Sequence, residues 1–206
     1  MTYKLPDLSY NYDDLEPYFD SKTMKIHHKG HHQAYINNLN NILINTKFIN
    51  YKEDELLSNL EFIPKKNRNY IKNNFGGYIN HNFFWKILKK NTILKGILKK
   101  EIEKYFINFE NFKKCFINIA MNHFGSGWVW LVQSKKKLLI TTTVNQDNPK
   151  MSKFFIKNTG FPIIGLDLWE HAYYLKYKNK KLEYIQSYFN IINWDQASIN
   201  FEKSFF

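Results

Sequence analysis

Residues 161–174 read Phe-Pro-Ile-Ile-Gly-Leu-Asp-Leu-Trp-Glu-His-Ala-Tyr-Tyr. The first eight are mostly apolar and are bounded by Gly160 and Pro162, which predicts a short β-strand. Asp167 and His171 lie four residues apart, at the end of this strand and before a further helical stretch. The strand end can therefore present both side chains to one site. In isolation such a pair is more often a chance surface arrangement, so the rest of the chain decides its meaning.

Two more strands are predicted before this one. Residues 128–133 follow a Gly-Ser-Gly at 125–127 and alternate with a period of two, as a half-buried strand requires. Residues 134–137 make a turn, and residues 138–144 form the second strand. The chain closes with a helical pattern from about Glu183 to Phe201. The lone Gly-Ser-Gly lacks the third glycine of a dinucleotide loop and is weak support for phosphate binding.

The first half of the chain has helical periodicity instead. A long pattern begins after Asp20 or Ser21, both plausible N-caps, and runs to about residue 42, interrupted only by Gly30. A shorter pattern at 51–64 ends at Pro64, and helical patterns follow at 69–90 and 93–106. We therefore expect an α+β fold. Residues 1–90 would form an N-terminal α-hairpin domain, and residues 91–206 a C-terminal α/β domain with a three-stranded antiparallel sheet and surrounding helices.

The seven histidines are unevenly placed, because four of them fall within residues 27–32. On a helix of about 100° per residue, His27, His31 and Tyr35 span about 80° and share one face. We expect these three side chains to face one site. His28 and His32 begin a second stripe, and we interpret them as surface or core-edge imidazoles.

Composition limits the chemistry. Cys115 is the only cysteine, so the chain has no intrachain disulfide or thiolate cluster, and any metal must use histidine and carboxylate ligands. No stretch approaches the roughly 20 apolar residues of a membrane helix, and the N-terminus lacks the pattern of a cleaved signal. We therefore expect a cytoplasmic protein with no membrane partner.

The formal net charge of +12 could attract nucleic acid, an acidic surface or a small anion. Arg68 is the only arginine, and lysine and asparagine are abundant along the whole chain, which indicates a compositional bias. Because the lysines are dispersed, we expect no nucleic-acid partner. The rival interpretation is a nucleic-acid-binding protein that uses its aromatic residues for stacking, and a salt titration of DNA binding would distinguish it.

Residues 167–174, Asp-Leu-Trp-Glu-His-Ala-Tyr-Tyr, resemble the signature of the iron/manganese superoxide dismutases. Other parts of the chain are similar to the same family, in the same order and over essentially the whole length. They are Leu-Pro-Asp-Leu-Ser-Tyr at 5–10, Leu-Glu-Pro at 15–17, residues 26–35, Gly-Gly-Tyr-Ile-Asn-His at 76–81, residues 124–131, Asn-Gln-Asp at 145–147 and Asn-Trp-Asp at 193–195.

The resemblance implies that one metal ion per subunit is held by His27, His81, Asp167 and His171. Three imidazoles and one carboxylate suit manganese or iron. They could also hold zinc, although the chain has no His-Glu-x-x-His motif. The implied activity converts superoxide to oxygen and hydrogen peroxide, by alternating reduction and oxidation of the ion with proton transfer through its bound solvent.

The resemblance also implies which metal is used. The family places a glutamine amide against the metal-bound solvent, and Gln146 matches the manganese pattern. The iron pattern takes this glutamine from the position four residues before the second ligand, which here is Gly77. We therefore predict manganese, with iron as the alternative. Tyr35 and His31 match the other catalytic positions, with Tyr35 in the substrate channel as a proton relay.

Further residues match the surroundings of the family's metal site. Trp85, Trp128 and Trp169 resemble a hydrophobic shell, although any one of them is equally compatible with a plain core role. Glu170 and Tyr174 resemble residues that reach His171 and His31 of the partner subunit, which implies an isologous homodimer and leaves a tetramer open.

Two positions depart from the family, and neither is a ligand. Phe189 stands where a tryptophan is common. Lys181 stands near the place of an arginine that attracts the anionic substrate. Lysine keeps the positive charge but loses the planar fork of arginine, so we expect steering with poorer positioning.

Overall fold

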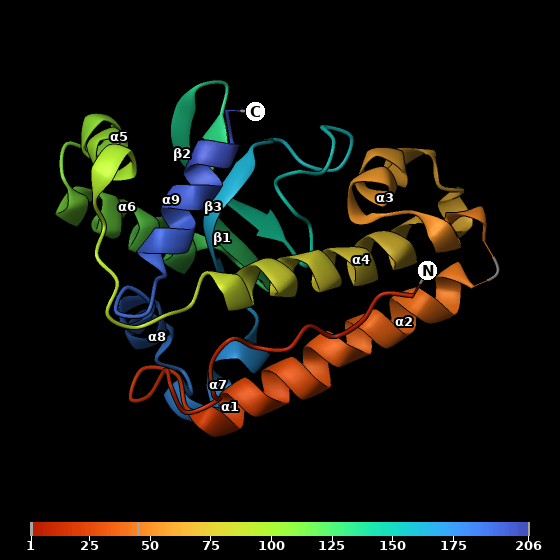
Figure 1. Ribbon diagram of the computed structural model, residues 1–206, viewed down its shortest axis with the longest axis horizontal. Helices are drawn as coiled ribbons and strands as arrows, with labels where there is room; N and C mark the ends of the chain where they lie inside the picture. Colours follow the sequence, from red (N-terminus) through yellow and green to blue (C-terminus); the bar gives the residue numbers. More distant parts are fainter. Residues whose placement is uncertain (1, 45, 206) are drawn as a thin grey trace.

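The computed structural model describes residues 2–44 and 46–205 (Figure 1). Its first long helix combines α1 (Ser21–Ile26), a π-helical turn η1 (His27–His32) and α2 (Gln33–Leu43). Asp20 is the N-cap, since its side chain accepts a hydrogen bond from the Thr23 backbone N–H at 2.9 Å. The interruption expected near Gly30 is thus a wide turn within a continuous helix.

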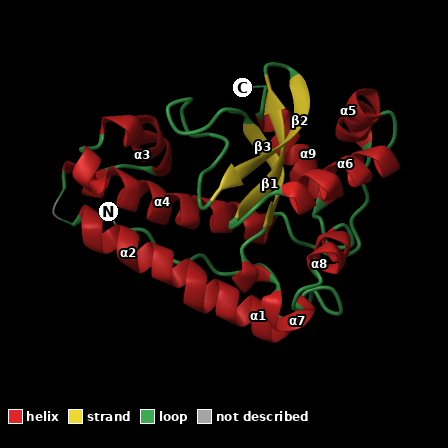
Figure 2. Ribbon diagram, turned by 180° about the vertical axis from the view of Figure 1, so that it is seen from behind, coloured by secondary structure: helices red, strands yellow, loops and turns green. Residues whose placement is uncertain are grey.

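A second long helix, α4 (Lys65–Lys86), packs beside α2, and the two form a helical hairpin (Figures 1 and 2). The connection contains η2 (Lys47–Asn50), α3 (Glu53–Asn59) and η3 (Leu60–Phe62). Pro64 ends it, and α4 begins at Lys65 rather than at the predicted residue 69. Apolar residues of α2, α3 and α4 bury one another here: Ile36, Leu39, Leu43, Leu56, Ile71 and Phe75. The hairpin therefore has its own hydrophobic cluster.

The second half of the chain builds an antiparallel sheet in the order β2-β1-β3, from β1 (Gly127–Ser134), β2 (Lys137–Val144) and β3 (Phe161–Asp167). Around it lie α5 (Gly96–Phe106), α6 (Phe109–Asn122), η4 (Glu170–Ala172), α7 (Tyr174–Tyr177), α8 (Lys181–Tyr188) and α9 (Trp194–Lys203). Figure 2 shows the sheet on the side of α4 away from α2. The predicted α+β fold, with its helical hairpin and three-stranded antiparallel sheet, is confirmed.

Two helical segments differ from the sequence-based expectation. Helix α6 was not predicted, although Asn108 caps it and Phe112, Phe116 and Ala120 form its buried face at a spacing of four. The single helix expected from about 183 to 201 is two helices, α8 and α9. The chain breaks between them because Asn193 donates its backbone N–H to the Ile87 carbonyl at 2.8 Å and caps α9 with its side chain.

The two halves of the chain meet where β3 ends. Asp167, the last residue of β3, lies opposite Trp128 in the β1–β3 register. Helix α4 contacts both β3 and η1, and η4 contacts α1. Elements from both halves therefore converge on one buried place. Across the described ranges 2–44 and 46–205, none of the helices has the combined length and apolarity that a membrane crossing needs.

Candidate metal centre

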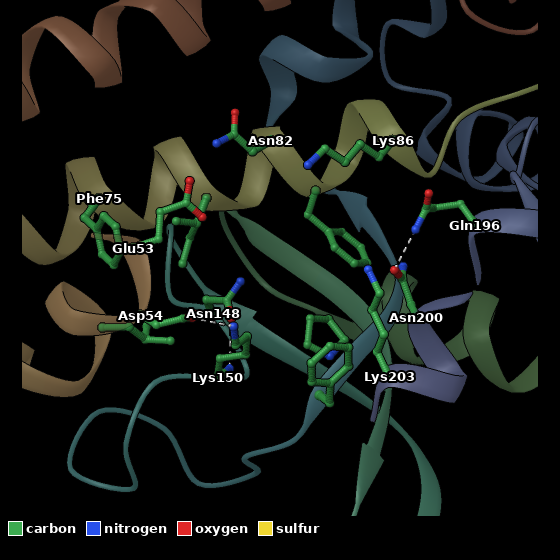
Figure 3. A pocket seen from close by; sticks show the side chains of 15 residues that line it. Glu53, Asp54, Phe75, Asn82, Lys86, Asn148, Lys150, Gln196, Asn200 and Lys203 are labelled. Atoms are coloured by element: carbon green, nitrogen blue, oxygen red, sulfur yellow. Dashed lines mark hydrogen bonds and ion pairs between the residues drawn. The ribbon is translucent and has the colours of Figure 1, made fainter. Parts of the chain in front are cut away.

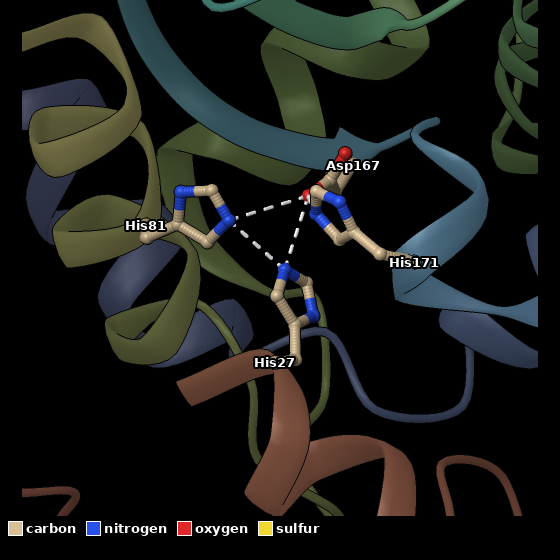
Figure 4. A group of neighbouring side chains, drawn as sticks. All are labelled: His27, His81, Asp167 and His171. Atoms are coloured by element: carbon tan, nitrogen blue, oxygen red, sulfur yellow. Dashed lines mark hydrogen bonds and ion pairs between the residues drawn. The ribbon is translucent and has the colours of Figure 1, made fainter. Parts of the chain in front are cut away.

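Four side chains from four elements converge between the hairpin and the sheet, as Figure 4 shows. His27 comes from η1, His81 from α4, Asp167 from the end of β3 and His171 from η4. One ligand atom from each lies within 4.8 Å of the other three. The Oδ2 of Asp167 lies 3.1 Å from Nε2 of His27, 3.2 Å from Nε2 of His171 and 3.5 Å from Nε2 of His81.

The local hydrogen bonds leave lone pairs directed into this group. The Nδ1 of His81 donates to the Gly77 carbonyl at 2.6 Å, so its Nε2 carries no hydrogen in the neutral ring. That Nε2 faces the Nε2 of His27 at 2.9 Å. The Oδ1 of Asp167 accepts the Trp169 backbone N–H at 2.9 Å, which leaves Oδ2 for the site. Nitrogen and carboxylate lone pairs brought this close together fit a cation such as manganese or iron.

Burial and charge favour the ionisation states that a metal needs. Burial lowers the pKa of His27 to about 3, which keeps the imidazole neutral. Burial by itself raises the pKa of Asp167. The adjacent His171 and the hydrogen bonds from His171, His27 and His81 outweigh that effect and hold the pKa of Asp167 well below its ordinary value. The group thus combines a neutral His27 imidazole with one buried, ionised carboxylate.

A buried amide network borders the four side chains. The Nε2 of Gln146 donates to the Tyr35 hydroxyl at 3.0 Å. The Oε1 of Gln146 accepts from Trp128 Nε1 at 3.0 Å and from Asn80 Nδ2 at 3.2 Å. Because both of these groups are donors, they distinguish the oxygen of the Gln146 amide from its nitrogen. Sequence reasoning gave Asn80 no role, although it stands next to His81 in a segment that resembles the family.

Two glycines let these parts approach one another. A Cβ at Gly77 would overlap the ring of Tyr35, and a Cβ at Gly76 would overlap the carbonyl oxygen of Gln146. Burial, together with the charge of Asp167, raises the pKa of Tyr35 to about 12, so the phenol stays protonated at neutral pH. The space that a side chain at position 77 would take is filled by the Tyr35 ring.

Comparison with known proteins agrees with this architecture. The family model of the iron/manganese superoxide dismutase alpha-hairpin domain matches residues 2–89, and the model of the C-terminal domain of the same enzymes matches residues 94–200. The chain belongs to the iron/manganese superoxide dismutase family. It is therefore an oxidoreductase of a family that catalyses superoxide dismutation at a metal ion.

Several relatives are similar over nearly their whole length, and each is named superoxide dismutase [Mn]. The protein of Buchnera aphidicola subsp. Acyrthosiphon pisum (strain APS) is 55% identical over 203 residues, covering 98% of this chain and 100% of its own. That of Buchnera aphidicola subsp. Baizongia pistaciae (strain Bp) is 53% identical over 202 residues, or 98% and 97% of the two chains. That of Escherichia coli (strain K12) is 48% identical over 202 residues, 98% of each chain.

Aromatic rings surround the four side chains of this superoxide dismutase. The ring centroid of Trp85 lies 4.9 Å from that of His27, and the centroid of Trp128 lies 5.4 Å from that of His81. Trp169 stacks on His171 with a centroid distance of 5.5 Å. His31 stacks on His171 at 4.1 Å. The structure therefore brings the three tryptophans and His31 into ring contact with the imidazoles of the group.

The second histidine stripe of this superoxide dismutase is not at the surface. His28 and His32 are both buried, so the interpretation as surface or core-edge imidazoles was wrong. The ring nitrogens of His28 contact the Tyr12 hydroxyl and the Pro6 carbonyl, each at 2.9 Å. The N-terminal segment covers this side of the helix, and helical periodicity alone does not reveal such a cover.

Glu170 and Lys181 lie at an opening to solvent. A cavity of about 370 Å³ is lined by Ser126, Trp169, Glu170, His171 and Lys181 among others. The Nζ of Lys181 donates to the His123 carbonyl at 3.3 Å, and burial lowers its pKa. Tyr174 and Glu170 are exposed. A positive charge therefore stands at the mouth that leads towards His171.

Proposed function

We propose that this superoxide dismutase holds one manganese ion with His27, His81, Asp167 and His171, with iron as the alternative metal. The observation that carries the proposal is the convergence of four ligand atoms within 4.8 Å, from elements far apart in the sequence. The manganese-type names of the relatives support the choice of metal. When bound, the ion would supply the one-electron oxidation and reduction that dismutation of superoxide requires.

The protein would supply a counter-charge for that ion and would exclude bulk water from it. Asp167 is fully buried, and it is the only carboxylate of the four groups. A buried cation without a counter-charge would be costly, and the carboxylate lowers that cost. Trp85 and Trp128 are buried against the imidazoles and exclude bulk water from two sides. We infer that they also limit movement of His27 and His81.

Tyr35 and Gln146 would provide hydrogen-bond donors for proton transfer to the substrate. Because the Tyr35 hydroxyl accepts a hydrogen bond from Gln146 Nε2, its own hydrogen is free to be donated elsewhere. The oxygen of Gln146 accepts from Trp128 and Asn80, so Nε2 is the donor end of the amide and carries a second hydrogen besides the one donated to Tyr35. A donor amide in this place is the basis of the manganese prediction. Lys181 would attract the anionic substrate at the mouth.

We also propose that two copies pair across the mouth of the site. Glu170 of one copy would bond His171 of the partner subunit, and Tyr174 would bond His31 of the partner subunit. Three exposed aromatic or apolar side chains near this face support the pairing, since Phe124 is 99% exposed, Tyr174 49% and Leu175 43%. Pairing of dimers into tetramers, the domain boundary near residue 90 and the cytoplasmic location stay predictions.

The test is metal analysis and activity on the same purified sample. Protein loaded with manganese or with iron should carry one ion per chain, and dismutase activity should follow the manganese content. His81→Gln should lose the metal, whereas His123→Gln, a histidine outside the four, should keep it. Folded wild-type protein that retains neither metal, or that is active only with iron, would contradict the proposal.

A further inference from the structure

His32 occupies a place behind the ligand group that no role so far explains. It lies in η1, it is fully buried, and it is not one of the four converging side chains. Its ring lies nearly parallel to that of His81, with centroids 5.3 Å apart and an interplanar angle of 19°. One face of a candidate ligand is therefore packed against His32.

A hydrogen bond joins His32 to a second part of the site. Its Nδ1 accepts the indole N–H of Trp85 at 3.0 Å, so in the neutral ring the hydrogen is on Nε2. In the described part of the chain, that Nε2 makes no hydrogen bond of normal geometry. The bond from Trp85 thus fixes the orientation of this ring, and the other polar partner of His32 is the backbone of Tyr78.

Trp85 in turn packs against another ligand. Its ring centroid lies 4.9 Å from that of His27, at an interplanar angle of 77°. His32 therefore contacts His81 directly and His27 through Trp85, which are the two candidate ligands of the helical hairpin. His81 is also held at its edge by the bond from Nδ1 to the Gly77 carbonyl. The hydrogen bond to Gly77 and the stacking of His32 together determine the plane of the His81 ring.

We propose that His32 is a positioning residue that sets the orientation of His81 by ring stacking and of the Trp85 indole by accepting its hydrogen bond. The proposal rests on the metal site proposed above. The two contacts can be removed separately. His32→Phe keeps a flat ring against His81 but offers no acceptor to Trp85, whereas His32→Gln keeps an acceptor and loses the ring. His32→Leu removes both.

The experiment measures manganese affinity by competition with a chelating dye, together with the visible absorption spectrum of the oxidised manganese protein. We expect His32→Phe and His32→Gln each to weaken manganese binding about tenfold and to shift the absorption band. His32→Leu should weaken binding by more than either. His28→Gln is the matched control, because it also removes a buried imidazole of η1 but keeps manganese affinity within about twofold and leaves the spectrum unchanged.

A second variant tests the hydrogen bond from the other side, in case the His32 variants do not fold. Trp85→Phe removes the donor and should weaken binding, and His32→Phe should cost little more once Trp85 is Phe, because no indole N–H is then left unpaired. Wild-type affinity and spectrum in Trp85→Phe, or in both His32→Phe and His32→Gln, would overturn the inference. A wild-type protein that binds no manganese or iron would instead overturn the proposed metal site.

Discussion

The two halves of the metal site are held in different ways. His27 and His81, from the helical hairpin, are fully buried and are packed by rings of the same chain, including Trp85, Trp128 and His32. His171, from the sheet region, is only partly buried and lies at the mouth beside the exposed Glu170. The hairpin half is thus fixed within one chain, whereas the other half is open on the side where we propose the second copy.

The two halves of the site should therefore respond differently to substitution. A change in the hairpin half meets tightly packed neighbours, so its effect should be local and large. A change at the mouth should act through dimer formation or through the approach of substrate. Asp167 connects the two halves, because its Oδ2 contacts imidazoles of both.

Asp167→Asn should have the largest effect. The substitution removes the only negative charge among the four side chains, and a buried cation would then lack its counter-charge. We expect manganese retention to fall by more than about 100-fold. Elemental analysis after dialysis against a chelator measures it, with the exposed Asp13→Asn as the control. Retention of a full manganese complement by Asp167→Asn would show that the two halves do not depend on this carboxylate.

Gly77→Ala should disturb the packing of the hairpin half of the site. The added Cβ overlaps the Tyr35 ring, so Tyr35 must shift away from Gln146. We expect a loss of stability of about 1–3 kcal/mol and a fall in dismutase activity of about 10- to 100-fold at unchanged metal content. Gly30→Ala is a matched control, because its Cβ meets only a side-chain methyl of Ile26 at 3.8 Å.

Gly30→Ala should change the stability of the protein in the opposite direction. Alanine is a better helix former than glycine, so Gly30→Ala should raise stability by about 0.5–1 kcal/mol and leave activity unchanged. Thermal unfolding of the two variants beside the wild type separates packing at Gly77 from helix propensity. Equal stabilisation by both substitutions would mean that Tyr35 and α4 are not closely packed.

The hairpin half also marks the limit of what the sequence could predict. The motifs and the helical period placed His27, His31 and Tyr35 on one face, and that face does meet His81 and His171. The same period could not say what covers the other face. His28 and His32 are buried by Pro6, Tyr12 and Trp85, which lie far from them in the sequence or outside the helix.

Long-range contacts explain the other differences as well. Asn80 acquires its place from Gln146, 66 residues away, through bonds to both its side chain and its backbone carbonyl. The break between α8 and α9 comes from pairing with the end of α4, where Leu88 forms a β-bridge with Ile192. Local patterns predicted most elements and their order, but contacts of this kind depend on the assembled fold.

Glu170→Gln should have an intermediate effect, confined to the mouth. The amide keeps the size of the side chain but loses the charge that we propose for bonding His171 of the partner subunit. We expect a larger fraction of monomer in sedimentation analysis and about a tenfold loss of metal retention. Glu183→Gln, an exposed glutamate paired with Lys180 at 3.1 Å, should change neither. A Glu170→Gln protein that stays dimeric and fully loaded would contradict the proposed cross-subunit bond.

Lys181→Arg should have the smallest effect and should show it only at high pH. Lysine is a cation below its pKa, and burial lowers the pKa of Lys181 from the ordinary lysine value. Its charge is therefore lost at a lower pH than that of a free lysine, whereas arginine stays charged. As the pH rises towards the ordinary lysine pKa, the kcat/KM of the wild type should fall before that of Lys181→Arg, with a gap of about two- to threefold that added salt closes. Identical pH profiles would show that the mouth attracts superoxide without the charge of Lys181.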